Sequence, residues 1–293
     1  MDDLGDLLKG AVDLHVHPGP SPYPRRIDAI GAAQAAARAG MRAIVLKSHH
    51  SDTATVIEAL RLHGLEELDA EVYGGVVLNS QVGGINPHAV SHSLAMGGRV
   101  VWMPTISSPA HISSTGHFPT ATVELIDERP IDVCDGAGKL LPAAYEVLEL
   151  VASADAVLAS GHLPARSIEA LFEAAREVGV SRLLVNHPNF IVDVDSALAR
   201  RLVALGAYIE HEVSMYDENS RFHAFPLATL EGWIELAGPE RTVLASDLGQ
   251  ADNPLPPESL QRIARRLVEG GLATAHVHDL LAANPARLLG IDS

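Results

Sequence analysis

The sequence is poor in aromatic residues and contains a single cysteine. Phe, Trp and Tyr make up 4% of the 293 residues, whereas 47% of the residues are hydrophobic. A large core must therefore be built from Ala, Val, Leu and Ile, and this hydrophobic fraction argues against disorder. Because Cys134 is the only cysteine, no disulfide can form within the chain, which suits a reducing cytosol.

Positive charge is also scarce. The chain has 21 Lys and Arg residues against 37 Asp and Glu residues, so its formal net charge is −16. Nucleic acids and anionic membranes select basic patches, so neither is expected as a partner. No apolar run reaches the roughly 18 residues of a membrane span, and the acidic start of the chain lacks the pattern of a secretory signal. We expect a cytoplasmic globular protein that acts on a small molecule, with a homo-oligomer left open.

One pattern repeats eight times: a short apolar run, a polar or histidine-bearing end, and a helical stretch. The apolar runs are rich in β-branched residues, which is typical of strands buried on both faces. They are Ala11–His17, Ala43–Ser48, Val72–Asn79, Val100–Thr105, Ala156–His162, Arg182–His187, Ala207–Glu212 and Thr242–Asp247. Helical spacing predicts helices over Asp28–Ala39, Thr53–Leu62, Ala143–Ser153, Arg166–Glu177 and Ser196–Leu205. Left-handed helix ends are expected at Gly40, Gly64, Gly179 and Gly206.

This alternation predicts an α/β fold with parallel strands and right-handed crossovers. Eight such units close most naturally into a (β/α)8 barrel, a TIM barrel, and we expect residues 1–293 to form one domain of this kind. An open doubly wound sheet is the alternative. It is less favoured because no glycine-rich phosphate loop follows the first strand.

A long connection, residues 105–141, follows the fourth strand. Short runs at Thr122–Ile126 and Ile131–Val133, before a glycine-containing turn, predict a loop followed by a small hairpin. A long βα connection of a barrel lies on the face that carries active sites, so this insertion is a candidate lid. A surface hairpin without a role is the alternative. His111 and His117 lie in the insertion and are candidates to reach the site.

Histidine and aspartate residues stand at the ends of four predicted strands. His15 and His17 end the first strand, and residues two apart on a strand point to the same face. The fifth strand ends at His162, the sixth at His187 and the eighth at Asp247. A barrel gathers these strand ends, so four imidazoles and one carboxylate are expected to converge. This donor set suits one or two divalent metal ions, with zinc as the first choice and Mn, Fe or Ni as alternatives.

The pattern of His-x-His, His, His and Asp resembles the amidohydrolase superfamily, and the resemblance covers nearly the whole chain. It implies a metal-dependent hydrolase on a barrel. It implies that His15 and His17 hold a first metal, and that His162 and His187 hold a second one if the site is binuclear. It also implies that Asp247 binds the first metal and acts as the catalytic acid and base.

The sequence departs from this superfamily at the fourth strand. Binuclear members usually have a bridging carboxylated lysine or a glutamate there, whereas Val100–Thr105 contains neither. Lys47 ends the second strand after four apolar residues, which aims its amine at the barrel mouth. A lysine beside metals loses its proton readily and can take up CO2 to become a bridging carbamate. The alternatives for Lys47 are an ammonium that binds a substrate carboxylate and an ion pair with Asp247 or another acid. If Lys47 does not bridge, the site is mononuclear or is bridged by Glu212.

Further polar residues at strand ends are candidates for substrate binding. His49 shares the parity of Lys47, Asn79 and Thr105 end the third and fourth strands, and either His211 or Glu212 must face inward. The candidates are His49, Asn79, Thr105 and Glu212. In the first βα loop, Tyr23, Arg25 and Arg26 are candidates to meet an anionic group, with a solvated loop as the alternative.

Together these residues predict hydrolysis by metal-activated water, with Asp247 moving the proton to the leaving group. The resemblance favours an amide or a cyclic amide as substrate, followed by a lactone. A metal-dependent decarboxylase or other lyase on the same site is one alternative. A metal-binding protein without catalysis is another.

Overall fold

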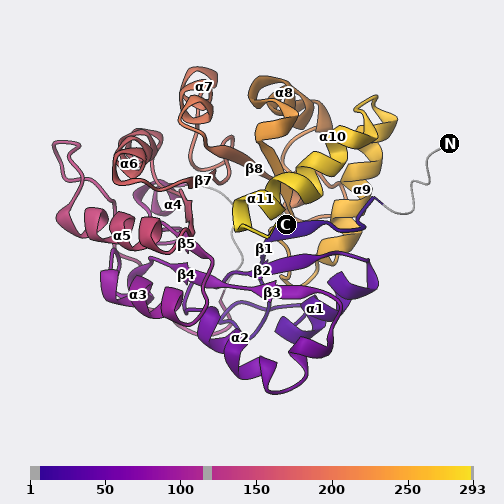
Figure 1. Ribbon diagram of the computed structural model, residues 1–293, viewed down its shortest axis with the longest axis horizontal. Helices are drawn as coiled ribbons and strands as arrows, with labels where there is room; N and C mark the ends of the chain where they lie inside the picture. The colour runs from indigo at the N-terminus through magenta and orange to yellow at the C-terminus, as the bar shows by residue number, and fades with distance from the viewer. Residues whose placement is uncertain (1–6, 115–120, 292–293) are drawn as a thin grey trace. The chain divides into compact units, whose positions relative to one another are not determined.

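The computed structural model describes residues 7–114 and 121–291 (Figure 1). The chain divides into two compact units. Unit 1 consists of Met1–Lys47, Ile57–Tyr73 and Glu210–Ser293, and unit 2 of Ser48–Val56 and Gly74–Ile209. Among the described residues, no helix has both the length and the apolar character that a bilayer crossing needs.

Unit 1 contains a parallel sheet in the order β1-β2-β3, with β9 beside β1. The strands are β1 (Val12–Val16), β2 (Ala43–Leu46), β3 (Glu71–Tyr73) and β9 (Thr242–Ala245). Every residue of β1, β2 and β9 is buried, as expected for parallel strands covered on both faces. The end of β1 is joined to the chain after β9 by a parallel bridge between Val16 and Leu248. This bridge places two polar strand ends next to each other.

The helices of unit 1 bury apolar residues. They are α1 (Ala29–Arg38), α8 (Leu227–Ala237), α9 (Pro256–Glu269), α10 (Thr274–His278) and α11 (Asn284–Leu289), with short helical turns at Leu65–Glu67, Val213–Met215, Pro239–Arg241 and Asp279–Ala283. Of these, α1 and α11 contact the strands. In α9 the buried residues Leu260, Ile263, Ala264 and Leu267 follow helical spacing. Asp28 begins α1 by accepting a hydrogen bond from the Gly31 N–H at 2.7 Å. One helix, α2 (Ala54–Arg61), has residues in both units.

Unit 2 contains parallel strands that pair in chain order. They are β4 (Gly75–Val77), β5 (Val100–Trp102), β6 (Val157–Ala159), β7 (Arg182–Val185) and the first residues of β8 (Tyr208–Glu212). The helices of this unit are α3 (Pro87–Ala95), α4 (Pro109–Ile112), α5 (Pro142–Ser153), α6 (Ala165–Val178) and α7 (Ser196–Ala204), with a helical turn at Ser80–Val82. Each strand is followed by a helix, which leaves the carboxyl ends of the strands free to carry polar residues.

The eight apolar runs of the repeating pattern and the five predicted helices are confirmed, with one division. The third predicted run forms two strands, β3 and β4, which pair with β2 and β5 respectively. At Gly75 a Cβ atom would lie 1.8 Å from the Val100 carbonyl oxygen, so only glycine allows the backbone of β4 to approach β5 this closely. The four glycines predicted at helix ends all have positive φ, between 70° and 100°.

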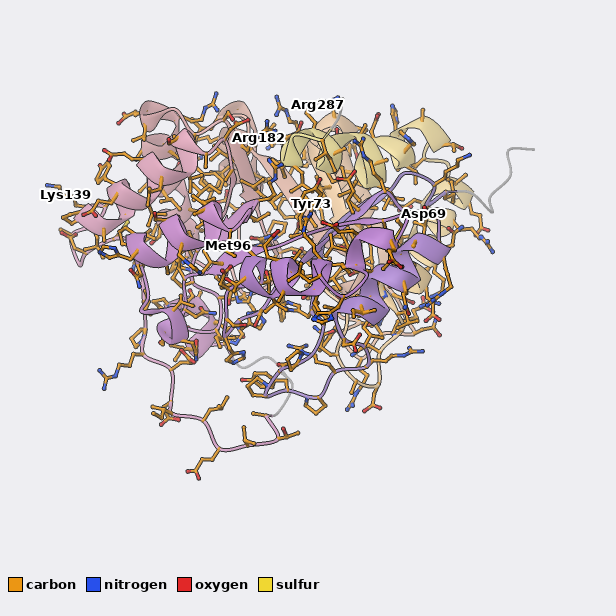
Figure 2. The ribbon with its side chains drawn as sticks, turned by 60° about the horizontal axis from the view of Figure 1, so that its bottom comes forward. Asp69, Tyr73, Met96, Lys139, Arg182 and Arg287 are labelled. Atoms are coloured by element: carbon orange, nitrogen blue, oxygen red, sulfur yellow. The ribbon has the colours of Figure 1, made fainter. Side chains whose placement is uncertain are left out.

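The strands predicted at Thr122–Ile126 and Ile131–Val133 are wrong. The described residues there form no strand, and the backbone N–H of Ile131 instead donates to the Ser107 carbonyl at 2.8 Å. A short antiparallel turn forms further along, where Cys134 bridges Leu140 near the exposed Lys139, labelled in Figure 2. Strand propensity alone could not create a hairpin here, because Ile126 is 92% exposed and gains no burial. His117 lies outside the described residues, and the role of the insertion as a lid stays a prediction.

Candidate metal centre

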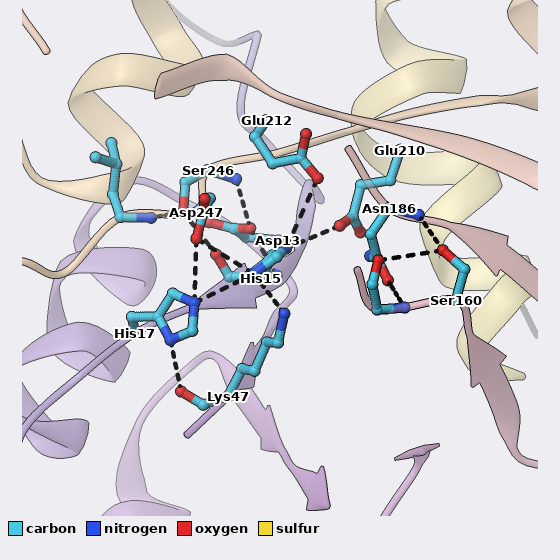
Figure 3. A network of polar contacts seen from close by, with 12 residues as sticks. Asp13, His15, His17, Lys47, Ser160, Asn186, Glu210, Glu212, Ser246 and Asp247 are labelled. Atoms are coloured by element: carbon cyan, nitrogen blue, oxygen red, sulfur yellow. Dashed lines mark hydrogen bonds and ion pairs between the residues drawn. The ribbon is translucent and has the colours of Figure 1, made fainter. Parts of the chain in front are cut away.

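Two imidazoles and one carboxylate of unit 1 point their ligand atoms at one another (Figure 3). His15 and His17 lie two residues apart near the end of β1, and their Nε2 atoms are 3.2 Å apart. Asp247 follows β9, and its Oδ1 lies 3.2 Å from His15 Nε2 and 3.1 Å from His17 Nε2. We call these three residues the metal centre, because their ligand atoms can hold a single cation.

The other ring nitrogen of each histidine fixes the orientation and the tautomer. His15 Nδ1 lies 2.8 Å from Glu210 Oε1, and His17 Nδ1 lies 2.9 Å from the Lys47 carbonyl oxygen. A carbonyl oxygen and a carboxylate accept hydrogen bonds, so both Nδ1 atoms carry the proton and both Nε2 atoms present a lone pair. Burial lowers the pKa of His17 to about 3, although Asp247 opposes this shift. A neutral imidazole at neutral pH is the form that binds metals.

Backbone contacts with β1 hold Asp247 in place. Its N–H donates to the His15 carbonyl at 2.8 Å, and the preceding Ser246 N–H donates to Asp13 Oδ1 at 2.9 Å. Asp247 has a φ of 53°, a left-handed conformation that is uncommon outside glycine. Such strained residues cluster at functional sites, because the surrounding structure must enforce them.

Gly249 allows this close approach. Its φ is 132°, and a Cβ atom there would lie 2.1 Å from the His17 carbonyl oxygen. Any side chain at this position would therefore push the chain after β9 away from β1. The spacing between His17 and Asp247 depends on the absence of that side chain.

The three ligand atoms fit a small divalent cation. Ligands about 2.0 Å from a tetrahedral zinc ion are separated by about 3.3 Å from each other. The separations of 3.1 to 3.2 Å in the metal centre agree with that geometry. Each imidazole side chain is 1% exposed, whereas the Asp247 side chain is 20% exposed. The carboxylate is therefore the member of the metal centre that a substrate can reach.

Lys47 lies against the metal centre. Its side chain is fully buried, and Nζ lies 3.0 Å from His15 Nε2. Burial lowers the pKa of Lys47 below its ordinary value, although Asp247, Glu210 and Glu212 act in the opposite direction. Lys47 thus lies beside the candidate metal ligands, as its place after four apolar residues suggested. Its role as a bridging carbamate stays a prediction.

Two glutamates of β8 lie on the other side of His15. Glu212 Oε1 lies 4.0 Å from His15 Nδ1, further away than Glu210, and both carboxylates are buried. His211 faces the opposite way, with Nδ1 3.2 Å from the Tyr216 hydroxyl. Of these two neighbours, Glu212 is therefore the one whose side chain lies near His15, and its contact with substrate stays a prediction.

Sequence reasoning missed Glu210 and Asp13. Both share strand parity with residues that were singled out: Glu210 with Glu212, and Asp13 with His15. Asp13 Oδ1 accepts hydrogen bonds from the backbone N–H groups of His15 and Ser246, at 3.1 and 2.9 Å. Burial raises the pKa of Asp13 to about 7. Polar residues at alternate positions of a buried strand were the signal that would have found both.

The predicted second pair of metal ligands, His162 and His187, lies in unit 2. Their ring centroids are 4.9 Å apart, and both residues are buried. His187 has a φ of 48°, again an uncommon conformation at a strand end. His111 reaches this pair from the insertion, with Nδ1 3.0 Å from His162 Nδ1. A second metal held by His162 and His187 stays a prediction.

Three of the predicted substrate-binding residues contact one another in unit 2. His49 Nδ1 lies 2.8 Å from Thr105 Oγ1, and Asn79 donates to the same oxygen at 2.8 Å. Asn79 also donates to the His49 carbonyl at 3.0 Å and accepts from the Thr105 N–H at 2.7 Å. Asn79 and Thr105 are fully buried and hold His49, which is partly exposed. Contact of these residues with substrate stays a prediction.

The comparison with protein families assigns the chain to one family. Residues 10–210 match the model of DUF6282, described as a family of unknown function, and the chain belongs to this family. No curated protein matches the chain.

Solved structures share the fold over nearly the whole chain. An amidohydrolase from Pseudomonas aeruginosa is 9% identical with a TM-score of 0.63, covering 98% of this chain and 97% of that one. The probable dipeptidase PvdM from Pseudomonas aeruginosa is 9% identical with a TM-score of 0.67, covering 99% and 96%. The lactonase Lmo2620 from Listeria monocytogenes is 14% identical with a TM-score of 0.57, covering 97% and 95%.

These structures confirm the predicted fold class, a parallel-stranded α/β fold of the TIM-barrel type. Their names all describe hydrolytic enzymes. At such low identities the likeness establishes the fold and leaves the reaction to be argued from the site.

Proposed function

We propose that the protein is a metal-dependent hydrolase that cleaves an amide, a cyclic amide or a lactone in a small molecule. The observation that carries this proposal is the metal centre, in which His15 Nε2, His17 Nε2 and Asp247 Oδ1 lie within 3.2 Å of one another. The resemblance of the sequence to the amidohydrolase superfamily supports the same conclusion, as does the fold of the chain, which hydrolases share. A bound divalent cation lowers the pKa of water towards neutrality and polarises a carbonyl oxygen.

The three ligands of the metal centre differ in their exposure to solvent, and this difference indicates their roles. His15 and His17 are buried ligands, which Glu210 and the Lys47 carbonyl hold in one orientation. Asp247 is the partly exposed ligand, so its carboxylate can accept a proton from water and return it to the leaving group. A purely structural metal site has no use for an exposed acid of this kind, which disfavours a protein without catalysis.

Lys47 is proposed to complete the centre as a carbamate. Its buried amine lies 3.0 Å from His15 Nε2, and a neutral amine combines with CO2 to form a carbamate with release of one proton. Nuclear magnetic resonance after incubation with isotopically labelled bicarbonate should detect the carbamate in the wild type and not in Lys47→Arg. A spectrum that is the same for both proteins would return Lys47 to its alternatives, an ammonium that binds substrate or an ion pair.

The proposed function is tested with the metal-loaded protein on a panel of amides, cyclic amides and lactones. Asp247→Asn should lower turnover at least about 100-fold, because general acid and base catalysis contributes that much. Asp252→Asn is the matched control, since that carboxylate is exposed and pairs with Arg221 at 3.0 Å. It should keep the wild-type rate. Wild-type activity in Asp247→Asn would refute the assigned role. CO2 release from carboxylic acids, without hydrolysis of any panel member, would favour the decarboxylase instead.

A further inference from the structure

The loop after β1 is held beside the metal centre by the segment after β9. The Arg26 N–H donates to the Gly249 carbonyl at 2.8 Å, and Arg25 forms an antiparallel bridge with Gln250. Gln250 Nε2 in turn donates to the Asp247 carbonyl at 3.0 Å. Because the backbone of the loop makes the contacts with Gly249 and Gln250, the backbone of Arg25 is held in place near Asp247.

The side chain of Arg25 is half-buried, and its charge is not paired by any described residue. Its Nε is buried without a hydrogen bond, and within the part of the chain that the structure describes the guanidinium forms no ion pair. Burial lowers the pKa of Arg25, while the charges of Asp247 and Tyr23 act to raise it. The positive charge of Arg25 also helps to lower the pKa of His17. Arg25 therefore exerts its charge on the metal centre.

The neighbouring Arg26 has the hydrogen bond and the nearby carboxylate that are expected of an arginine with a structural role. Its guanidinium donates to the Asn253 carbonyl and lies 3.8 Å from Glu258 Oε2, and the residue is exposed. Arg25 has no comparable hydrogen bond or ion pair among the described residues, and burying a cation without one is unfavourable. A ligand that brings a negative charge would supply that partner.

The charges around the metal centre also favour a role for Arg25 in binding an anion. The chain has a formal net charge of −16, and Asp247, Glu210 and Glu212 all lie at the site. These carboxylates repel an anionic substrate, and a cation on the loop beside them offsets part of that repulsion. Guanidinium binds carboxylate and phosphate oxygens through two parallel hydrogen bonds, which also fixes the orientation of the bound group.

We propose that Arg25 binds an anionic group of the substrate, a carboxylate or a phosphate, beside the bond that is cleaved. This inference rests on the proposed function and narrows the substrate class to amides or lactones that are also acids. It makes Arg25 a residue that determines specificity, separate from the ligands of the metal centre.

The test measures binding by calorimetry to the metal-loaded, full-length protein. The probes share one acetamido group and differ in charge: N-acetylglycine, acetamidomethylphosphonate and the neutral N-acetylglycinamide. The wild type should bind at least one anionic probe about 10- to 100-fold more tightly than the neutral probe, as expected for charge-assisted hydrogen bonds. Arg25→Met should lose this preference and keep its affinity for the neutral probe. Whichever anion shows the preference identifies carboxylate or phosphate as the recognised group.

Arg26→Met is the matched control, because it removes the same charge one residue away and should keep the preference. Arg25→Lys should keep part of it, since it retains the charge without the two parallel hydrogen bonds. A variant counts as folded when its metal content and melting temperature equal those of the wild type. If Arg25→Met is not folded, Arg25→Gln replaces it. A preference retained in the folded neutral variant, or absent from the wild type, would overturn the inference. Failure of the wild type to hydrolyse any substrate would overturn the proposed function alone, because binding is measured without turnover.

Discussion

Glu210 and Glu212 offer a direct test of how the metal centre is held. Both carboxylates belong to β8 and both are buried, but Glu210 lies 2.8 Å from His15 Nδ1 and Glu212 lies 4.0 Å away. Only the shorter distance is a hydrogen bond. Hence Glu210 should orient His15 and raise its basicity, whereas Glu212 should contribute little to the affinity for metal.

The expected magnitude follows from this difference. Loss of a hydrogen-bond partner of a metal-binding histidine typically weakens metal affinity about 10- to 100-fold, which corresponds to about 1.4 to 2.8 kcal/mol. Glu210→Gln keeps an acceptor and loses the charge, so it should fall at the lower end of this range. Glu210→Ala loses both and should fall at the upper end. Glu212→Gln removes the same charge two residues away but no hydrogen bond to His15, so it should weaken the affinity less than Glu210→Gln does.

The assay is competition for zinc between the protein and a chelator of known affinity. Melting temperatures of the metal-free proteins control for unfolding, because both glutamates are buried. If Glu212→Gln weakened zinc binding as much as Glu210→Gln, the distances would not govern the effect and the reasoning would be refuted. An unchanged affinity in Glu210→Ala would refute it equally.

Two further predictions concern stability. Gly249→Ala should lower the free energy of unfolding, measured by urea titration, by about 2 kcal/mol or more, because the new Cβ atom meets the His17 carbonyl. The control Gly136→Ala, with no atom within 4 Å of its Cβ, should change this free energy by less than about 0.5 kcal/mol. Equal effects of the two substitutions would contradict the close approach at Gly249. Burial raises the pKa of Asp217, but hydrogen bonds from Arg262 and Ser259, both at 2.7 Å, outweigh burial, so the net pKa lies below its ordinary value. The folded state therefore holds this proton less tightly than the unfolded state, and the stabilisation is present above the unfolded pKa of about 3.9 and is lost as pH falls below it. Asp217→Asn should be less stable than the wild type by about 1 to 3 kcal/mol at pH 7, with the difference shrinking below about pH 4; a difference independent of pH would contradict this sign.

The strands and most helices could be predicted because the apolar runs of the strands and the helical spacing of apolar residues are both clear in this chain. Buried parallel strands have no polar face, so each appears as an uninterrupted apolar run, and polar residues at its end stand out. That contrast identifies His15, His17, Lys47 and Asp247 from the sequence alone. Lys47 could be singled out because it follows four apolar residues.

The remaining features depend on contacts between distant segments. Glu210 contacts His15 across 195 residues of sequence, and periodicity within one strand does not reveal such a pair. The incorrect hairpin at Thr122–Ile126 had strand-forming residues, but strand formation requires a partner and burial, and this segment has neither among the described residues. From the sequence, Arg25 is one of three loop residues that are candidates to meet an anionic group, and only the bridge to Gln250 shows which site it serves.

The central claim is that His15, His17 and Asp247 bind a divalent metal ion. It is tested most directly by elemental analysis of protein purified without chelators, for the wild type, His17→Ala and the exposed control His63→Ala. The wild type and His63→Ala should each contain at least one equivalent of metal, and folded His17→Ala should lose it. A wild type that holds no metal, even after reconstitution with zinc, manganese, iron or nickel, would show that these three residues are not a metal site.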